Sequence, residues 1–188
     1  MKSGYSNAIE LALKKLEALD KERVCEITGA SFENGEYVLP WFNMTGKISE
    51  GPDFERIVKL HYLISEGGKR PTGQLIAFRE VPGALFYDPK FIARAVTPLV
   101  KAFGNNPENL IKTAQLVGGR EAKAGDAAVK IDILPFMPVT YIIWGKDDEN
   151  EASGSVLFDK SAPGWLAAED LVVLASLGTY KLLSLLKG

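Results

Sequence analysis

Helices are predicted where apolar residues recur every three or four positions. This spacing predicts helices over 9–19, 53–66, 89–103, 107–117 and 168–187, and a shorter one over 21–28 that Asp20 caps and Gly29 ends. Pro98 predicts a kink in the helix over 89–103, because proline cannot donate the helical hydrogen bond. Gly178 lies inside the last helix, where glycine costs about 1 kcal/mol relative to alanine, and this predicts a close packing contact.

Strands are predicted where apolar and polar residues alternate or where short β-branched runs stand between turn signals. They cover 36–42 and 43–49, after the turn 33–35, and then 72–81, 126–134, 139–144 and 155–158. Pro40 places its strand at a sheet edge or a bulge. Because helices and strands do not alternate strictly, we expect an α+β fold. Its antiparallel or mixed sheet of short strands would carry packed helices, one of them a long C-terminal helix.

Composition narrows the class of protein further. The 188 residues are 46% hydrophobic, which suits a single globular domain over 1–188 with its own core. The 22 Lys and Arg residues are interleaved with 24 Asp and Glu residues, so no basic surface for nucleic acid is expected. No apolar run is long enough for a membrane span, and no secretion signal is visible, so a cytoplasmic protein without a membrane partner is expected. The oligomeric state stays open.

Strong catalytic and metal-binding motifs are absent from the sequence. It contains no phosphate-binding GxxxxGK[ST], no GxGxxG after a strand and no GxSxG. One cysteine, Cys25, cannot form an intramolecular disulfide or hold an iron–sulfur cluster. A single histidine and a single cysteine cannot fill a zinc site, and the acidic run 147–151 lacks the pattern of a calcium loop. No metal site is therefore predicted.

His61 is the first candidate for cofactor binding. It lies on the face of the helix over 53–66 that carries Phe54, Ile57 and Val58, and this face should meet the core. Burial there would lower the pKa of the imidazole and present a nitrogen lone pair inward, where it could bind the iron or cobalt of a tetrapyrrole. The alternative is a core histidine that is hydrogen-bonded to a carbonyl or a carboxylate.

Arg79, Tyr87 and Arg94 are further candidates for binding an anionic ligand. Arg79 shares a predicted strand face with apolar residues, and Arg94 falls within a mainly apolar helix. A buried arginine must be paired, and its planar guanidinium suits carboxylates and phosphates. The alternative is internal ion pairing with one of three acids: Glu80, Asp159 or Glu169.

Asp159 and Glu169 form the third candidate group. Asp159 ends a predicted strand, and Glu169 stands in the first turn of the last helix, so the two could face each other as an acid–base pair. The alternative is that Glu169 and Asp170 only stabilise the positive end of that helix.

Four strings indicate a family: LHYLISEGG, PTGQLIAFREVPGALFYDPKFIARAVTPL, GDAAVKIDILPFMPVTYIIWGKDDE and LFDKSAPGWLAAEDL. With them the chain resembles, from about Tyr5 onward, the family called domain of unknown function 3786. The resemblance implies an anaerobic bacterium or archaeon as the source. Some relatives carry an additional N-terminal iron–sulfur domain, whose cysteines this chain lacks. The family has no established activity, so the resemblance implies no catalytic residue.

Three functions remain open from the sequence. The first is a ligand-binding accessory domain for anaerobic one-carbon or corrinoid metabolism, in which His61 is an axial ligand of a tetrapyrrole and Arg79, Tyr87 and Arg94 bind its anionic groups. The second is a protein-interaction scaffold without a cofactor. The third is a hydrolase or transferase that uses Asp159 and Glu169 together with Arg79.

Overall fold

The computed structural model describes residues 5–186 and has the predicted α+β fold, with two antiparallel sheets. The larger sheet has the strand order β4-β8-β7-β6-β5. Its strands are β4 (Leu75–Ala77), β5 (Arg120–Glu121), β6 (Ala127–Leu134), β7 (Met137–Trp144) and β8 (Ser153–Asp159). The smaller sheet consists of β1 (Ser31–Glu33), β2 (Glu36–Trp41) and β3 (Met44–Lys47). The predicted strands over 126–134 and 139–144 are present as β6 and β7, which pair as an antiparallel hairpin.

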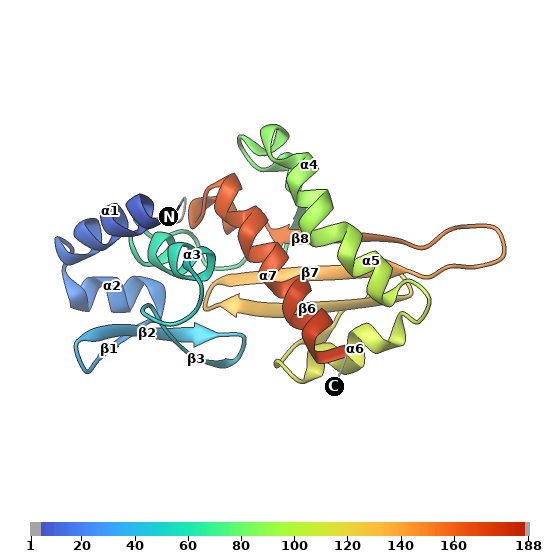
Figure 1. Ribbon diagram of the computed structural model, residues 1–188, viewed down its shortest axis with the longest axis horizontal. Coiled ribbons are helices and arrows are strands. Elements are labelled where there is room, and N and C mark those ends of the chain that lie inside the picture. Colours follow the sequence, from blue (N-terminus) through green and yellow to red (C-terminus); the bar gives the residue numbers. More distant parts are fainter. Residues whose placement is uncertain (1–4, 187–188) are drawn as a thin grey trace.

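The helices form one layer over the larger sheet and a cluster beside it. They are α1 (Ser6–Glu17), α2 (Lys21–Thr28), α3 (Asp53–Leu63), α4 (Asp88–Phe91), α5 (Thr97–Phe103), α6 (Glu108–Gln115) and α7 (Ala168–Leu186). In Figure 1, α7 and α5 cross in front of the larger sheet, while α1, α2, α3 and the smaller sheet lie to one side. The last predicted helical residue, Lys187, lies outside the described residues. Within residues 5–186, no helix combines the length and the apolar character that crossing a membrane requires.

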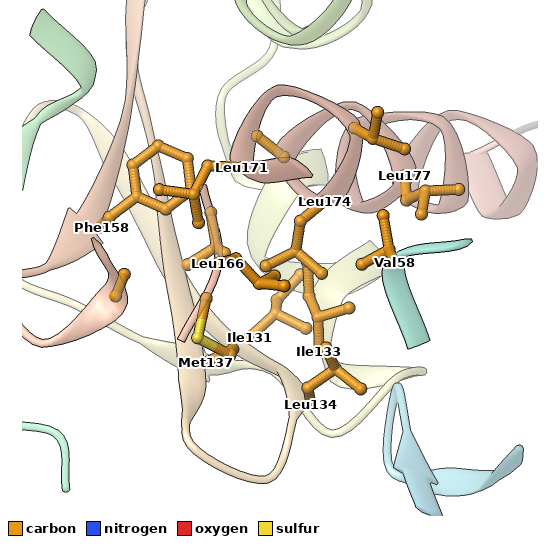
Figure 2. Packing of buried hydrophobic residues seen from close by; sticks show 14 of the residues in the cluster. Val58, Ile131, Ile133, Leu134, Met137, Phe158, Leu166, Leu171, Leu174 and Leu177 are labelled. Carbon is orange, nitrogen blue, oxygen red and sulfur yellow. The ribbon is translucent and has the colours of Figure 1, made fainter. Parts of the chain in front are cut away.

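The core lies between α7 and the larger sheet. Figure 2 shows Leu171 and Leu174 of α7 above Ile131 and Ile133 of β6, and all four side chains are fully buried. Alternation along β6 points every second residue toward α7. Each such buried side chain contributes about 1.5–3 kcal/mol of hydrophobic stabilisation. Helix α7 is apolar around most of its circumference, as expected of a helix enclosed by its neighbours.

The predicted contact at Gly178 is confirmed. A Cβ atom at this position would overlap the hydroxyl of Tyr141 from β7. That hydroxyl is buried and donates a hydrogen bond to the carbonyl of Ala175, with an O–O distance of 3.0 Å. Glycine thus lets the central helix and the central strand approach each other.

The predicted helix over 89–103 is interrupted by a π turn, Ile92–Val96, between α4 and α5. Four residues of this segment are buried at a spacing of four: Phe91, Ala95, Leu99 and Phe103. In an α-helix such a spacing drifts about 40° around the axis at each step, because each residue turns by about 100°. A π turn takes up more residues than an α turn and keeps these side chains on one face.

Two side chains account for the position of this π turn. Pro98 has no N–H to donate to the carbonyl of Arg94, four residues before it, so the α pattern cannot run through this point. The carbonyl of Ala95 accepts a hydrogen bond from Thr179 Oγ1 of α7 at 2.9 Å. The predicted disturbance at Pro98 is therefore present as a π turn, and Arg94 lies at its centre.

The predicted strand over 72–81 is too long at both ends. Only β4 is extended, and Phe78–Glu80 forms a 3₁₀ turn. Glu80 Oε2 accepts a hydrogen bond from the N–H of Ala77 at 2.7 Å. Phe78 turns inward and stacks on Phe91, with ring centroids 4.3 Å apart. These contacts stop the strand before it reaches Arg79.

Pro40 lies in the central strand of the smaller sheet. The residues of β2 that pair with β1 are Glu36–Val38, so Pro40 stands beyond them and pairs only with β3. On one side this part of β2 is therefore an edge, where a missing N–H is tolerated.

Candidate functional site: a groove along the C-terminal helix

His61 lies on α3 with its side chain 35% exposed rather than enclosed in the core. Its Nδ1 is 2.9 Å from both carboxylate oxygens of Asp170 on α7. The hydrogen bond with Asp170 raises the pKa of His61, although partial burial acts in the opposite direction. The predicted lowering of this pKa is therefore wrong. Of the alternative, the hydrogen bond to a carboxylate is present, but the histidine is partly exposed and does not lie in the core.

Arg79 and Arg94 are both exposed, so neither is the buried arginine that the sequence indicated. Arg79 donates from Nε and Nη2 to one oxygen of Asp88, at 2.9 and 2.7 Å. Its partner, Asp88, is not one of the acids that were expected to pair with it. The 3₁₀ turn at Arg79 and the π turn at Arg94 carry these side chains away from the faces on which they were placed.

Tyr87 lies near the beginning of α7. Its hydroxyl is 3.4 Å from Glu169 Oε2, and the negative charge of Glu169 raises the pKa of the tyrosine. Tyr87 is followed by Asp88, and Glu169 by Asp170. The pairs of Arg79 with Asp88, Tyr87 with Glu169, and His61 with Asp170 therefore join the 3₁₀ turn, α4, α7 and α3, and we call them the paired set.

Asp159 is buried at the end of β8 and belongs to the structure of a turn. Its carboxylate accepts hydrogen bonds from the N–H groups of Thr72, Gly73 and Ser161 at 3.0, 2.7 and 2.9 Å. Burial alone would raise the pKa of Asp159, but these backbone hydrogen bonds outweigh it and the pKa is lowered. Glu169 is engaged with Tyr87 instead. The structure thus does not form the predicted acid–base pair of Asp159 and Glu169.

The candidate site is a groove along α7, made of two adjoining hollows of about 430 and 330 Å³. Both are lined by Phe54, Leu177 and Tyr180, which makes them one continuous surface. The floor is formed by Val173, Ser176 and Leu177 of α7. The remaining lining residues are Tyr5, Trp41, Phe42, Met44, Thr45, Glu55, Arg94, Lys181 and Ser184. We call it the α7 groove.

Large apolar side chains are exposed along this groove. Phe54 is 41% exposed and Tyr180 is 51% exposed, and Met44 is still more accessible. They come from α3, α7 and β3, so three distant segments of the chain meet here. A surface where aromatic side chains gather over a buried helical floor is typical of a binding site.

The turn between β2 and β3 holds an aromatic side chain in a strained backbone conformation. Phe42 and Asn43 both have positive φ, at 51° and 58°. This is rare for a bulky residue and is often found at functional sites. Phe42 is kept in place by its burial and by its N–H, which donates to the carbonyl of Ile133 at 3.2 Å. Opposite, Gly46 leaves room for Trp41, because a Cβ there would come within 2.7 Å of it.

A buried lysine supports this wall of the groove. Lys59 donates from Nζ to the carbonyls of Lys47 and Glu50 at 2.6 and 2.7 Å, and its Nζ lies 5.5 Å from the ring centre of Trp41. Burial lowers its pKa. Lys59 was not among the predicted site residues, although a lysine between the buried apolar residues of α3 was a visible signal.

The groove has charged side chains that are not paired. Arg94 and Lys181 line it, and neither side chain makes a hydrogen bond or an ion pair with any residue from 5 to 186. One acidic residue, Glu55, is also in the lining. A guanidinium next to an apolar groove is well suited to hold a carboxylate, a sulfonate or a phosphate. The arrangement can therefore bind a molecule with an apolar body and an anionic group.

Among the described residues, the lining contains one buried hydroxyl, that of Ser176, which donates to the carbonyl of Val172 at 2.6 Å. Within the described residues, no group of three or more His, Cys, Asp and Glu side chains could hold a metal ion. The geometry of the α7 groove supports the binding of a ligand.

Comparisons with known proteins place the chain in one family. The family described as Domain of unknown function (DUF3786) matches residues 20–181. No curated protein and no solved structure matches the chain.

Proposed function

The chain belongs to the family Domain of unknown function (DUF3786), and we propose that it is a ligand-binding domain whose α7 groove takes an elongated apolar molecule with one anionic group. The family description names no activity, so the proposal rests on the groove itself. The observation that carries it is the unpaired guanidinium of Arg94 beside the apolar floor of Val173 and Leu177.

The apolar part of the ligand would lie against Phe54, Tyr180 and the floor of α7. Covering apolar ligand surface contributes about 2.5 kcal/mol for roughly every 100 Å² removed from water. The anionic group would lie near Arg94, and Lys181 in the adjoining hollow adds a second positive charge to the groove. The two cations outweigh Glu55, so an uncharged or cationic ligand of the same shape would bind more weakly.

The test compares two fluorescent dyes that share the same rings. 8-Anilinonaphthalene-1-sulfonate carries a sulfonate, and N-phenyl-1-naphthylamine is its uncharged counterpart. The wild type should bind the sulfonate dye more tightly. Arg94→Gln should weaken its binding roughly tenfold, equivalent to about 1.4 kcal/mol, and leave binding of the uncharged dye unchanged.

Arg79→Gln is the matched control, because Arg79 is also exposed but is paired with Asp88. This variant should bind both dyes like the wild type. Equal affinity of the wild type for the two dyes, or equal effects of the two substitutions, would contradict the proposal. Near-ultraviolet circular dichroism of each variant checks that the dyes report on the native state, since the sulfonate dye also binds loosened folds.

A tetrapyrrole ligand is the other form of a ligand-binding function, and it needs a site outside the α7 groove. It requires a macrocycle beside His61, which does not line the α7 groove and whose Nδ1 is engaged by Asp170. Its Nε2 is then the atom available to iron or cobalt. An absorbance band on addition of haem or cobalamin that His61→Ala abolishes would support this form, and an unchanged spectrum would exclude it. The link to anaerobic one-carbon metabolism rests on the family resemblance alone.

A protein-interaction role is the second candidate, and one surface feature favours it. Leu85 and Phe86 are 74% and 88% exposed on a short 3₁₀ turn before α4, at the protruding end of the molecule in Figure 1. Ala84 beside them is buried and fixes the turn. A change of Leu85 and Phe86 to Ser should lower the molar mass measured by light scattering if these side chains hold a dimer together. An unchanged monomer mass in both proteins would exclude such a dimer.

A further inference from the structure

The geometry points to a second binding site, on the face of the larger sheet that is turned away from α7, for a small hydroxylated carboxylate. In Figure 1, α5 and α7 lie in front of this sheet. On the other face, a hollow of about 610 Å³ lies over the middle strands. Its walls include the turn at Thr72 and Gly73 on one side and Glu121 of β5 on the other. The site is separate from the α7 groove and does not depend on it.

The floor of this hollow carries a hydroxyl group without a partner. Thr140 lies in the central strand β7 and is only 2% exposed. Its side chain points to the face opposite Val139 and Tyr141, which are in the core. No residue from 5 to 186 forms a hydrogen bond with its Oγ1. Because this oxygen is not fully enclosed, it faces the hollow and can form a hydrogen bond with a polar ligand that displaces water there.

A lysine stands next to this hydroxyl. Lys130 of β6 is the direct cross-strand partner of Thr140, and it is partly buried in the lining of the hollow. Its ammonium forms no ion pair within the described part of the chain. Two acids line the same hollow, but the carboxylate of Asp159 is already occupied by the N–H groups of Thr72, Gly73 and Ser161. The ammonium is thus available to an anion from outside.

The third group defines the ligand more narrowly. Glu121 is exposed at the wall of the hollow and can accept a hydrogen bond. A ligand carboxylate between Lys130 Nζ and Thr140 Oγ1 would be bound by a charge-assisted pair and a hydroxyl donor. A hydroxyl on the same ligand could then donate to Glu121. This set of one cation, one hydroxyl and one carboxylate matches a small hydroxy acid better than a simple anion.

The experiment is a titration with malate and with succinate, which differ by one hydroxyl, followed by the backbone amide signals in nuclear magnetic resonance at constant ionic strength. Malate should cause saturable shifts at Thr72, Gly73, Lys130 and Thr140. Succinate should bind several-fold more weakly, as expected for one missing hydrogen bond. Lys130→Gln should weaken malate binding about tenfold or more. Glu121→Gln should remove the preference for malate.

Lys123→Gln is the matched control. Lys123 is exposed on the connection between β5 and β6 and does not line the hollow. It should bind malate like the wild type. Absence of saturation, shifts located elsewhere, equal affinities for malate and succinate, or unchanged binding in Lys130→Gln would overturn the proposal. Arg94→Gln should have no effect here, so the two sites can fail independently.

Discussion

The paired set and the α7 groove lie along the same helix, but their cationic side chains differ in whether they have a carboxylate partner. Around the beginning of α7, His61 and Arg79 each have a carboxylate partner within 3 Å. Farther along α7, Arg94 and Lys181 have no partner within residues 5–186. A paired charge is satisfied by the fold and contributes to its stability, whereas an unpaired charge beside an apolar groove is free for a ligand. Identity and exposure of an arginine therefore say less about function than its partners do.

The largest effect on stability is expected at Asp159, whose carboxylate is bound by N–H groups of the fold. Asp159→Asn replaces an acceptor of several N–H bonds by an amide that must turn one donor toward them. It should lower the free energy of unfolding by about 2–4 kcal/mol, as expected for a buried charge with several hydrogen bonds. Urea denaturation measures this loss, while dye binding in the α7 groove stays unchanged. A variant of unchanged stability with altered dye binding would contradict the assignment of Asp159 to the fold and not to the α7 groove.

The same carboxylate predicts sensitivity to acid. The pKa of Asp159 is lower in the folded protein than its ordinary value of 3.8. Such a group contributes stability above its unfolded pKa, and this contribution is lost as the pH falls through the folded value. The wild type should therefore lose stability more steeply below about pH 4 than Asp159→Asn, when both are followed by urea denaturation at several pH values. Parallel pH profiles would contradict this role.

A smaller effect is expected at Thr179, which helps to place Arg94. Thr179→Val keeps the shape of the side chain but leaves the carbonyl of Ala95 without its hydrogen bond. The π turn should loosen and place Arg94 less well. The preference for the sulfonate dye over the uncharged dye should therefore fall roughly threefold, which is less than the effect of removing the guanidinium of Arg94. Thr179→Ser retains the hydroxyl and should restore the preference. If both variants lower it equally, Thr179 acts only through packing.

The smallest effect is expected at His61, whose partly exposed pair is screened by water. Its pKa is raised above 6.5 in the folded protein. The pair thus contributes stability below pH 6.5 that is lost as the pH rises through the folded pKa. His61→Gln should cost less than about 1 kcal/mol at pH 6 and still less at pH 9, measured by urea denaturation. A cost that grows with pH would contradict the ion pair.

Much of the fold follows from local patterns in the sequence. The hairpin of β6 and β7 and the long helix α7 arise from clear alternation and helical spacing, and Gly178 marked a close approach that the structure contains. A disturbance at Pro98 was predicted, but its form as a π turn and the 3₁₀ turn at Phe78 were missed because distant contacts contribute to both. Phe78 stacks on Phe91, and Thr179 bonds to Ala95. The buried spacing of four in residues 91–103 was the available signal.

The candidate site was only partly predictable. Arg94 was singled out as an anion-binding residue, and it does line the α7 groove. Trp41 and Leu177, which also line the groove, belonged to no predicted site. Phe54 was assigned to the core face of its helix, yet it lies at the rim. The groove joins segments more than a hundred residues apart, and no local pattern reports which side chains meet across such a distance.

The most direct measurement follows the side-chain Nε–H signals of the arginines in nuclear magnetic resonance during titration with 8-anilinonaphthalene-1-sulfonate. Arg94→Gln and Arg79→Gln assign the two signals. We expect the chemical shift of the Arg94 signal to change until the dye saturates the site, while the Arg79 signal keeps its chemical shift. Movement of the Arg79 signal, or a stationary Arg94 signal at saturating dye, would contradict the claim that the unpaired guanidinium of the α7 groove binds the anion.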